Sequence, residues 1–187
     1  MTRKQKKVNV STLIIVIMAI FMISVVFCTV YKSYIDHKYV EYMRNEYSMY
    51  QKHFKKLTYP VFVMTKISCK KHGVAVPEML ALIQNESNFS QFAISCKGAM
   101  GYTQLMPDKI SRYKMTDPFD IRENIDVGVQ FYKYCKKRAH GNIQLAFMKY
   151  NGGPNRVKFA PNGESEIYGK RCIADVRKMR GIIVAMM

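Results

Sequence analysis

The residue best placed to do chemistry in this sequence is Glu86. It ends a short apolar run that begins at Met79, and Pro77 precedes the run where a first helical turn would lie. At helical spacing Met79, Leu82 and Ile83 share one face with the Glu86 carboxyl group. Burial on such a face raises the pKa of a carboxyl group, and an acid still protonated near neutral pH can serve as a general acid. The competing interpretation is a glutamate that bends out to water, because carboxylates are rarely fully buried.

Two further segments stand at characteristic distances from Glu86. Ser87 follows it directly, residues 98–107 read GAMGYTQLMP, and residues 147–154 read FMKYNGGP. In order and spacing they resemble the motifs of the lysozyme-like lytic transglycosylases of the soluble type. Those motifs are a Glu-Ser pair, a Gly-x-x-Gly-Leu-Met-Gln-x-Met-Pro loop and an Ala-Tyr-Asn-Ala-Gly-Pro segment. The resemblance covers residues 61–157, and three motifs in register make it specific.

The chain departs from these motifs at several positions. Tyr102 and Thr103 replace the usual Leu-Met pair of the loop, and Lys149 replaces the usual alanine. Residues 164–168, ESEIY, weakly resemble the Glu-Thr-x-x-Tyr-Val segment of the family, with Gly169 in place of valine. No role is carried over to this last segment.

The resemblance implies a reaction that needs one carboxyl group only. In this family a glutamate protonates the glycosidic oxygen, the N-acetyl group of the substrate stabilises C1, and the glutamate then takes the proton of the 6-hydroxyl group that attacks C1. Glu86 would carry both roles, without a metal or a cofactor. Glycosidases usually use two carboxylates, but the acids at 108, 117, 120, 123 and 126 all have structural interpretations, such as the start of a helix.

Further residues are assigned to the site by resemblance. Ser95 matches a position that contacts the N-acetyl group, Gln104 matches the glutamine that lines the cleft, and Met106 would form part of its wall. Tyr150 matches a tyrosine placed to hydrogen-bond near the catalytic glutamate. Each has a plain alternative, because a serine in a turn, a glutamine on loop backbone or a methionine or tyrosine in the core needs no ligand. The expected supporting set is Ser87, Ser95, Gln104, Met106, Tyr150 and Asn151. Gly98 and Gly101 would let the loop turn and approach the sugar closely.

An uncharged stretch of 18 residues, 13–30, follows a basic cluster at residues 3–7. The stretch is near the lower limit for a bilayer span, and the basic cluster predicts a cytoplasmic amino terminus. The rest of the chain would lie across the cytoplasmic membrane, on its periplasmic or extracellular side. A cleaved signal peptide is the competing interpretation, but its apolar core is normally shorter.

The formal net charge is +17. Because the basic residues are dispersed and no nucleic-acid motif accompanies them, nucleic acid is not an expected partner. A basic surface also suits peptidoglycan, whose peptides carry carboxylates. Cys28 lies in the apolar span. The other four cysteines, Cys69, Cys96, Cys135 and Cys172, allow three complete disulfide pairings in an oxidising compartment, with buried free thiols as the alternative.

The chain is expected to be mainly α. The pattern predicts a helix that ends at Gly73, a catalytic helix over 77–85, a loop with short elements over 87–107, and helices over 122–140, 142–150 and 165–179. Tyrosine pairs recur over 31–60, where a helical stalk is the plain interpretation. The domain plan is a basic tail over 1–12, a transmembrane anchor over 13–30, a tyrosine-rich stalk or linker over 31–60, a lytic transglycosylase domain over 61–160 and a C-terminal helix over 161–187 that completes the domain.

The predicted function is therefore non-hydrolytic cleavage of the MurNAc–GlcNAc bond of peptidoglycan by a membrane-anchored enzyme. One alternative is a hydrolase of the goose-type lysozyme kind, in which water is the acceptor. The other is a structural or docking component of a wall-spanning secretion, conjugation or phage apparatus, with the connector 31–60 as the docking surface.

Overall fold

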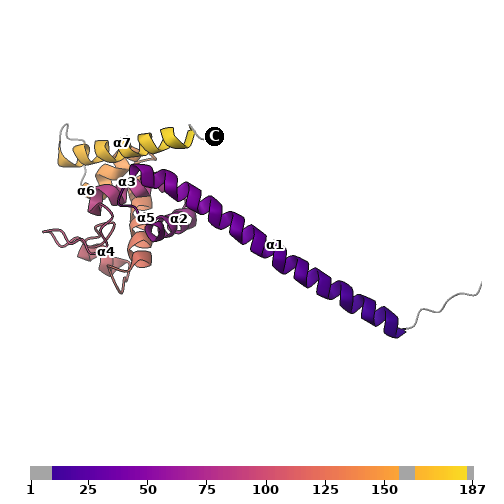
Figure 1. Cartoon of the computed structure of the whole chain (residues 1–187). Helices are drawn as coiled ribbons and strands as arrows, with labels where there is room; N and C mark the ends of the chain where they lie inside the picture. Colours follow the sequence, from indigo (N-terminus) through magenta and orange to yellow (C-terminus); the bar gives the residue numbers. More distant parts are fainter. Residues whose placement is uncertain (1–9, 156–162, 185–187) are drawn as a thin grey trace, which may run out of the picture. The chain divides into compact units, whose positions relative to one another are not determined.

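The computed structural model describes residues 10–155 and 163–184, and the side chains of 14–155 and 163–181. Part of the expected basic tail and the boundary at 160 lie outside the described residues. Within them the secondary structure is helical (Figure 1), and two isolated β-bridges join Ile94, Met100 and Leu105. The helices are α1 (Val10–His53), α2 (Tyr59–His72), α3 (Val76–Ser87), α4 (Pro107–Arg112), α5 (Ile121–Arg138), α6 (Ile143–Gly152) and α7 (Glu164–Val184).

Helix α1 runs without a break from the expected anchor into the expected stalk. The chain divides into two compact units, Met1–Asn45 and Glu46–Met187, so most of α1 forms the first unit and its last turns belong to the second. From Ile14 onward α1 is long and apolar enough to cross a membrane, with a mean hydropathy of 2.8 over its most apolar window. The side chains of that window are exposed, as a lipid-facing helix requires.

The last turns of α1 belong to the second unit through aromatic contacts. Tyr50 is buried, and its ring centroid lies 5.7 Å from that of Phe62 in α2. Tyr47 donates a hydrogen bond to the carbonyl oxygen of Leu57 at 3.1 Å. The expected end of the connector, residue 60, is Pro60, and it lies in the first turn of α2, where proline is tolerated because its missing N–H has no intrahelical partner.

The ends of the other helices follow local signals in the sequence. Gly73 ends α2 with φ 69°, the left-handed conformation that glycine adopts without cost. The side chain of Asp120 accepts from the amides of Arg122 and Glu123 at the start of α5, and Asn142 accepts from Leu145 at the start of α6. The short helix α4, which the sequence did not suggest, begins at Pro107.

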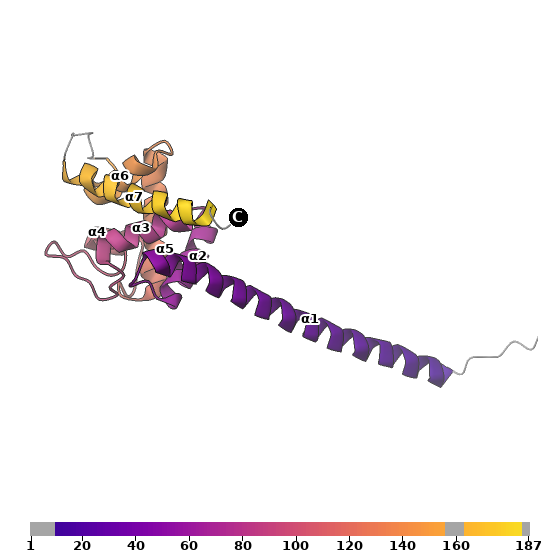
Figure 2. The same ribbon diagram turned by 45° about the horizontal axis from the view of Figure 1, so that its top comes forward.

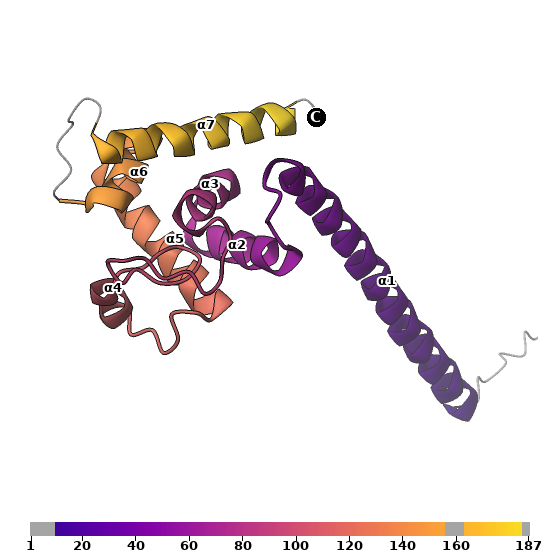
Figure 3. The same cartoon turned by 60° about the vertical axis from the view of Figure 1, so that its left-hand side comes forward.

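Helix α3 is the central element of the second unit. It packs against α2 and α7, while α5 packs against α2 and α6, and α6 against α7. Figures 2 and 3 show α7 lying across α6 and α3. Met79, Leu82 and Ile83 of α3 are fully buried, which confirms the apolar face expected from their spacing. Burial of each such side chain contributes about 1.5–3 kcal/mol.

The amino-terminal turn of α3 contains a buried ion pair. Glu78 is only 1% exposed, and both of its carboxylate oxygens lie 2.9 Å from the Nζ atom of Lys136 in α5. The hydroxyl group of Tyr132 donates to Glu78 Oε2 at 2.9 Å. The carboxylate therefore has a cation and a neutral donor in direct contact, which offsets the cost of burying its charge.

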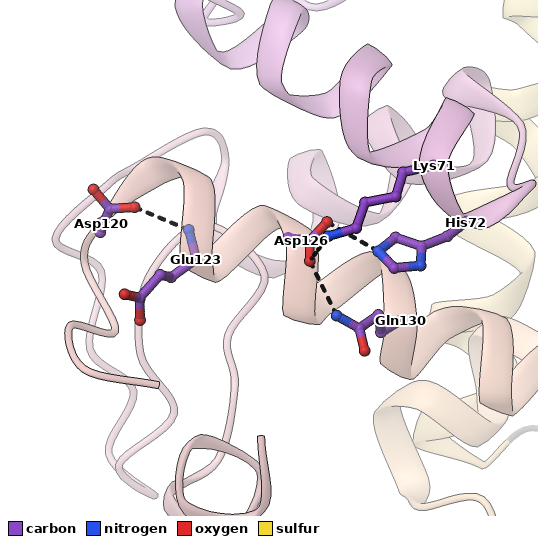
Figure 4. A network of polar contacts seen from close by, with 6 residues as sticks. All are labelled: Lys71, His72, Asp120, Glu123, Asp126 and Gln130. Atoms are coloured by element: carbon purple, nitrogen blue, oxygen red, sulfur yellow. Dashed lines mark hydrogen bonds and ion pairs between the residues drawn. The ribbon is translucent and has the colours of Figure 1, made fainter. Parts of the chain in front are cut away.

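A second polar network joins the carboxyl end of α2 to α5 (Figure 4). Asp126 accepts from Lys71 at 2.9 Å and from Gln130 at 3.0 Å, and its Oδ1 atom lies 2.9 Å from Nε2 of His72. These contacts tie the carboxyl end of α2 to α5 through the one carboxylate of Asp126.

The five cysteines are free thiols in the structure. Cys69, Cys135 and Cys172 are buried, and burial raises the pKa of each thiol to about 12. Cys28 and Cys96 are exposed.

Candidate active site

Glu86 lies in the last turn of α3, and its carboxyl group has one hydrogen-bond donor among the described side chains. The hydroxyl group of Tyr168, in α7, donates to Glu86 Oε1 at 2.7 Å. Burial raises the pKa of Glu86 from 4.5 to about 7, although the hydrogen bond from Tyr168 and the charge of Arg171 both act to lower it. Asn88 ends the helix in the left-handed conformation, with φ 53°. Glu86 therefore stays on the domain side of the helix and does not bend into open solvent.

A cleft of about 1320 Å³ opens in front of Glu86. Its walls come from the loop before α4, from α4 itself, from α5, from the carboxyl end of α6 and from the start of α7. Six residues expected in the site line this one cleft: Glu86, Ser95, Gln104, Met106, Tyr150 and Asn151.

Ser87 is the expected site residue that does not line the cleft. Its hydroxyl group donates to the carbonyl oxygen of Tyr102 at 2.7 Å and lies 3.3 Å from that of Ile83. The first bond ties the end of α3 to the loop that forms one wall of the cleft. Ser87 thus acts on the relative position of Glu86 and this loop.

Ser95 and Gln104 both hold the loop backbone while they line the cleft. Ser95 Oγ accepts from the amide of Ala99 at 3.0 Å. Gln104 has a positive φ of 48°, and its Nε2 atom donates to the carbonyl oxygens of Ala93 and Gly101 at 3.1 and 3.0 Å. The amide group of Gln104 is therefore engaged through its nitrogen, and no hydrogen bond from a described residue reaches its oxygen.

The hydroxyl group of Tyr150 contacts the loop, whereas the hydroxyl group that contacts the Glu86 carboxyl group is that of Tyr168. The Tyr150 hydroxyl group donates to the carbonyl oxygen of Thr103 at 2.8 Å, and the Tyr150 ring packs at 4.9 Å from that of Phe131. The side chain is buried, which agrees with the alternative interpretation of Tyr150 as a core residue. The residue that contacts Glu86 directly is Tyr168, in the segment to which the sequence assigned no role.

The departure at Thr103 has a physical explanation in Asn124, which the sequence did not single out. Asn124, fully buried in the first turn of α5, accepts from the amide and hydroxyl groups of Thr103 at 2.9 and 2.8 Å. It also donates to the carbonyl oxygens of Met100 and Pro118. A buried asparagine must satisfy its amide group internally, and here it does so by holding the loop.

Two glycines allow close contacts that a side chain would prevent. At Gly101, with φ 76°, an added Cβ atom would lie 2.2 Å from Asn124 Nδ2. The absence of a side chain at Gly101 therefore makes room for Asn124, and not for a molecule in the cleft. At Gly169, which replaces the valine of the family segment, a Cβ atom would lie 2.7 Å from Met148 Cγ and 3.0 Å from the carbonyl oxygen of Gln144. Gly169 therefore lets α7 approach α6 and bring Tyr168 to Glu86.

The other acids of the chain offer little to support a two-carboxylate site. Asp108 lines the cleft but is paired with Lys109. Glu123 binds Thr116, and Asp126 belongs to the network of α2 and α5. Glu164, in the first turn of α7, is the further carboxyl group that lines the cleft. Among the described residues no cluster of three or more His, Cys, Asp or Glu side chains could hold a metal ion.

A cleft with a half-buried glutamate in a helical domain fits the lysozyme-like class expected from the sequence, and the comparisons identify the family. Residues 64–169 match the family model of the transglycosylase SLT domain. The chain is 28% identical over 123 residues to the membrane-bound lytic murein transglycosylase C of Yersinia enterocolitica, a match that covers 56% of this chain and 34% of that protein. The chain thus spans about a third of the length of this relative.

Solved structures agree on the fold. An inactive mutant of the lytic transglycosylase Slt from Pseudomonas aeruginosa superposes with a TM-score of 0.56 at 20% identity, over 66% of this chain and 24% of that one. The 70 kDa soluble lytic transglycosylase from Escherichia coli also gives 0.56 at 20% identity, over 64% and 24%. The chain belongs to the transglycosylase SLT domain family.

Proposed function

We propose that this protein is a peptidoglycan lytic transglycosylase that cleaves the MurNAc–GlcNAc bond and leaves 1,6-anhydroMurNAc ends. The observation that carries this proposal is the position of Glu86 in the cleft with a pKa of about 7, held by Tyr168. A carboxyl group with this pKa is partly protonated and partly ionised at neutral pH. It can therefore give a proton in one step and take a proton in the next.

The proposed reaction balances without water. Glu86 gives its proton to the glycosidic oxygen as the bond from C1 to that oxygen breaks, and the substrate's N-acetyl oxygen stabilises C1. The Glu86 carboxylate then takes the proton of the 6-hydroxyl group, whose oxygen forms the new bond to C1. The residue returns to its protonated form, and the sugar ends as an anhydro ring.

Product mass distinguishes this reaction from hydrolysis. We expect purified peptidoglycan digested by the protein to give products lighter by one water than those of a lysozyme, with no ¹⁸O incorporated from labelled water. Products of hydrolysed mass with incorporated ¹⁸O would assign the protein to the hydrolases. Glu164→Gln adds a second arm, because a hydrolase that used Glu164 to activate water would lose about 10²–10⁴-fold in rate, whereas the proposed mechanism does not use it.

The charges of the cleft support an anionic glycan polymer as the substrate. Lys97 and Arg112 line the cleft beside the paired Lys109 and Asp108. The carboxylates of peptidoglycan peptides would meet these cations. Ionic strength should therefore weaken substrate binding, because exposed charges are screened within about 10 Å at 0.1 M salt.

We further propose that α1 anchors the protein in the cytoplasmic membrane, with the amino terminus in the cytoplasm. The support is the apolar window of α1 and the basic cluster that precedes it in the sequence. The relative from Yersinia enterocolitica is named as membrane-bound. A reporter that is active only outside the cytoplasm, fused after Met187, should give signal, and signal only from a cytoplasmic reporter would overturn the topology.

A partner in a wall-spanning secretion or conjugation apparatus would find exposed aromatic groups on α1. Tyr31, Tyr34, Tyr39 and Tyr42 are all more than half exposed. Tyrosines in this position also suit the interface of a membrane. Pull-down with a 31–60 peptide, compared with a peptide in which these four are serine, tests the docking proposal.

A further inference from the structure

Two neighbouring residues in the last turn of α3 are held by the same helix. Tyr168 of α7 donates to Glu86, and Asp175 of α7 accepts from Asn85 Nδ2 at 3.0 Å through its Oδ2 atom. Tyr168 and Asp175 are seven residues apart and therefore lie on one face of α7. Asn85 also donates to the carbonyl oxygen of Ala81 at 2.8 Å, so that its side chain is fixed against its own helix and against α7 together.

Asp175 has a second partner at the end of α1. Its Oδ1 atom lies 3.1 Å from Nε2 of His53, the last residue of α1. Phe54 follows, is 1% exposed, and packs edge-on against the His53 ring at 4.7 Å and against Phe89 at 5.5 Å. The carboxyl end of α1 therefore reaches both α7 and the segment that follows the catalytic turn.

We propose that His53, Asp175 and Asn85 form a chain of positioning residues that sets the place of Glu86. The inference rests on the proposed function, because it concerns the same carboxyl group. Asp175 fixes α7 against Asn85, and this holds Tyr168 in register with Glu86 one residue further along α3. His53 in turn fixes the side chain of Asp175. The catalytic unit then begins at the end of α1, before residue 64 where the family match starts.

The molecule contains a matched pair with which this proposal can be compared. His72 Nε2 lies 2.9 Å from Asp126 Oδ1 (Figure 4), and the corresponding distance between His53 Nε2 and Asp175 Oδ1 is 3.1 Å. The side chains are 14% and 22% exposed in the first pair and 19% and 21% in the second. Both pairs join the last turn of one helix to another helix. Only the pair of His53 and Asp175 also contacts a neighbour of Glu86, through Asn85. The comparison therefore separates an effect on the position of Glu86 from an effect on general stability.

The first experiment measures kcat and KM of the full-length chain in detergent micelles, with soluble peptidoglycan strands as substrate. We expect His53→Ala and Asp175→Ala to lower kcat about five- to twentyfold with KM within about twofold, since small displacements of a reacting group are costly in rate. His72→Ala, the control, should leave kcat per folded molecule within about twofold, because its lost hydrogen bond affects only stability. His53→Gln keeps an N–H donor for Asp175 and should recover most of the rate.

A second measurement does not depend on the chemistry. Amide hydrogen exchange of residues 84–90 reports on the catalytic turn, where the Asn88 amide donates to the Gln84 carbonyl oxygen at 3.1 Å. We expect His53→Ala to speed exchange in this segment about threefold or more, and His72→Ala to leave it unchanged, because local opening free energies differ across a structure.

The outcomes separate the two proposals. Equal rates for His53→Ala and His72→Ala per folded molecule, or a rate loss that only follows the unfolded fraction and is not rescued by His53→Gln, would overturn the positioning chain. Unchanged exchange in residues 84–90 would overturn it as well. A wild-type protein that yields hydrolysed products or none would overturn the proposed function, while the exchange pattern would still test the chain of contacts.

Discussion

Helix α3 carries two glutamates in two very different settings. Glu78 is fully buried but touches a lysine ammonium group and a tyrosine hydroxyl group, all within 2.9 Å. Glu86 is half-buried, has one tyrosine donor at 2.7 Å, and its pKa is raised to about 7. The same residue type, two turns apart in one helix, thus has a cation in direct contact at one end and only a neutral donor at the other.

The difference between the two glutamates shows that one carboxyl group of α3 serves stability and the other serves chemistry. A cation in direct contact stabilises the ionised form of a buried carboxylate, and Glu78 has such a contact with Lys136. Glu86 has a neutral donor in contact, and the positive Arg171 acts only through space. A direct ammonium contact at Glu86 would keep it ionised and unable to give a proton. The missing contact is therefore part of what the site requires.

The largest expected effect is the loss of activity in Glu86→Gln. Removing a general acid typically costs about 10²–10⁴-fold in rate, and the double role of Glu86 puts the loss at the upper end or beyond. The substitution is nearly isosteric, so circular dichroism should not change. Zymography and product analysis measure the loss, and wild-type turnover in this variant would remove Glu86 from the mechanism.

A glutamate-to-glutamine substitution at the other end of α3 should lower stability and leave activity intact. Glu78→Gln leaves the Lys136 ammonium group without its partner, and we expect a loss of about 2–3 kcal/mol in the free energy of unfolding, at or below the usual range for a broken buried pair because Lys136 is partly exposed. Activity per folded molecule should persist. Urea unfolding gives the first quantity and active-site-normalised turnover the second. A stable but inactive Glu78→Gln protein would contradict the separation.

Tyr168→Phe sharpens the comparison at Glu86. A hydrogen bond to an ionisable group contributes about 1.5–3 kcal/mol, which corresponds to roughly ten- to a hundredfold in kcat if it acts in the transition state. This hydrogen bond lowers the pKa of Glu86, so its loss should raise that pKa. The alkaline limb of the pH–rate profile, where Glu86 loses its proton, should move to higher pH. A lower rate with an unmoved limb would mean that Tyr168 acts otherwise.

The raised pKa of Glu86 also predicts a pH-dependent stability. The folded protein keeps a proton that the unfolded chain releases between pH 4.5 and about 7, so the free energy of unfolding decreases as pH rises through this window. Glu86→Gln removes this dependence. The variant should be more stable than wild type above pH 7 by on the order of 3 kcal/mol, because the pKa is raised from 4.5 to about 7 and each pKa unit corresponds to about 1.4 kcal/mol. Melting curves at both ends of the window measure the difference, and equal curves would mean that the pKa is not shifted.

The smallest expected effect is that of Tyr150→Phe. Its hydroxyl group binds the Thr103 carbonyl oxygen and not Glu86. We therefore expect a loss of about 1 kcal/mol in stability and a change in rate smaller than that of Tyr168→Phe. Thermal melting and turnover measured on Tyr150→Phe and Tyr168→Phe show which substitution costs more stability and which costs more rate. A larger rate loss for Tyr150→Phe would give Tyr150 the closer role.

Local signals in the sequence were enough for much of the fold. The apolar spacing before Glu86, the glycine at 73 and the N-cap residues Asp120 and Asn142 each determine their helix ends through contacts within a few residues. The end of the connector at residue 60 was harder to predict from the sequence. The residues around Pro60 do not show whether a helix ends before it or begins at it, because proline is common both after a helix and in a first helical turn.

The site was predictable where one motif carried the contact and not where two distant segments meet. The contact of Tyr168 with Glu86 spans 82 residues and depends on the angle at which α7 crosses α3. The weak match of its segment, together with Gly169, was the available signal. Asn124 was missed because an asparagine in the first turn of a helix is ordinary in sequence, and its importance comes from the loop it holds.

The distribution of thiols makes the cleft selectively addressable. Alkylating reagents attack thiolates, so Cys69, Cys135 and Cys172, buried and with a pKa of about 12, should stay unmodified while the protein is folded. Cys96 is exposed and lines the cleft. In the unit from Glu46 onward, a water-soluble maleimide dye or spin label would therefore attach beside the substrate path without any engineered cysteine, and its signal would report directly on occupancy of the cleft.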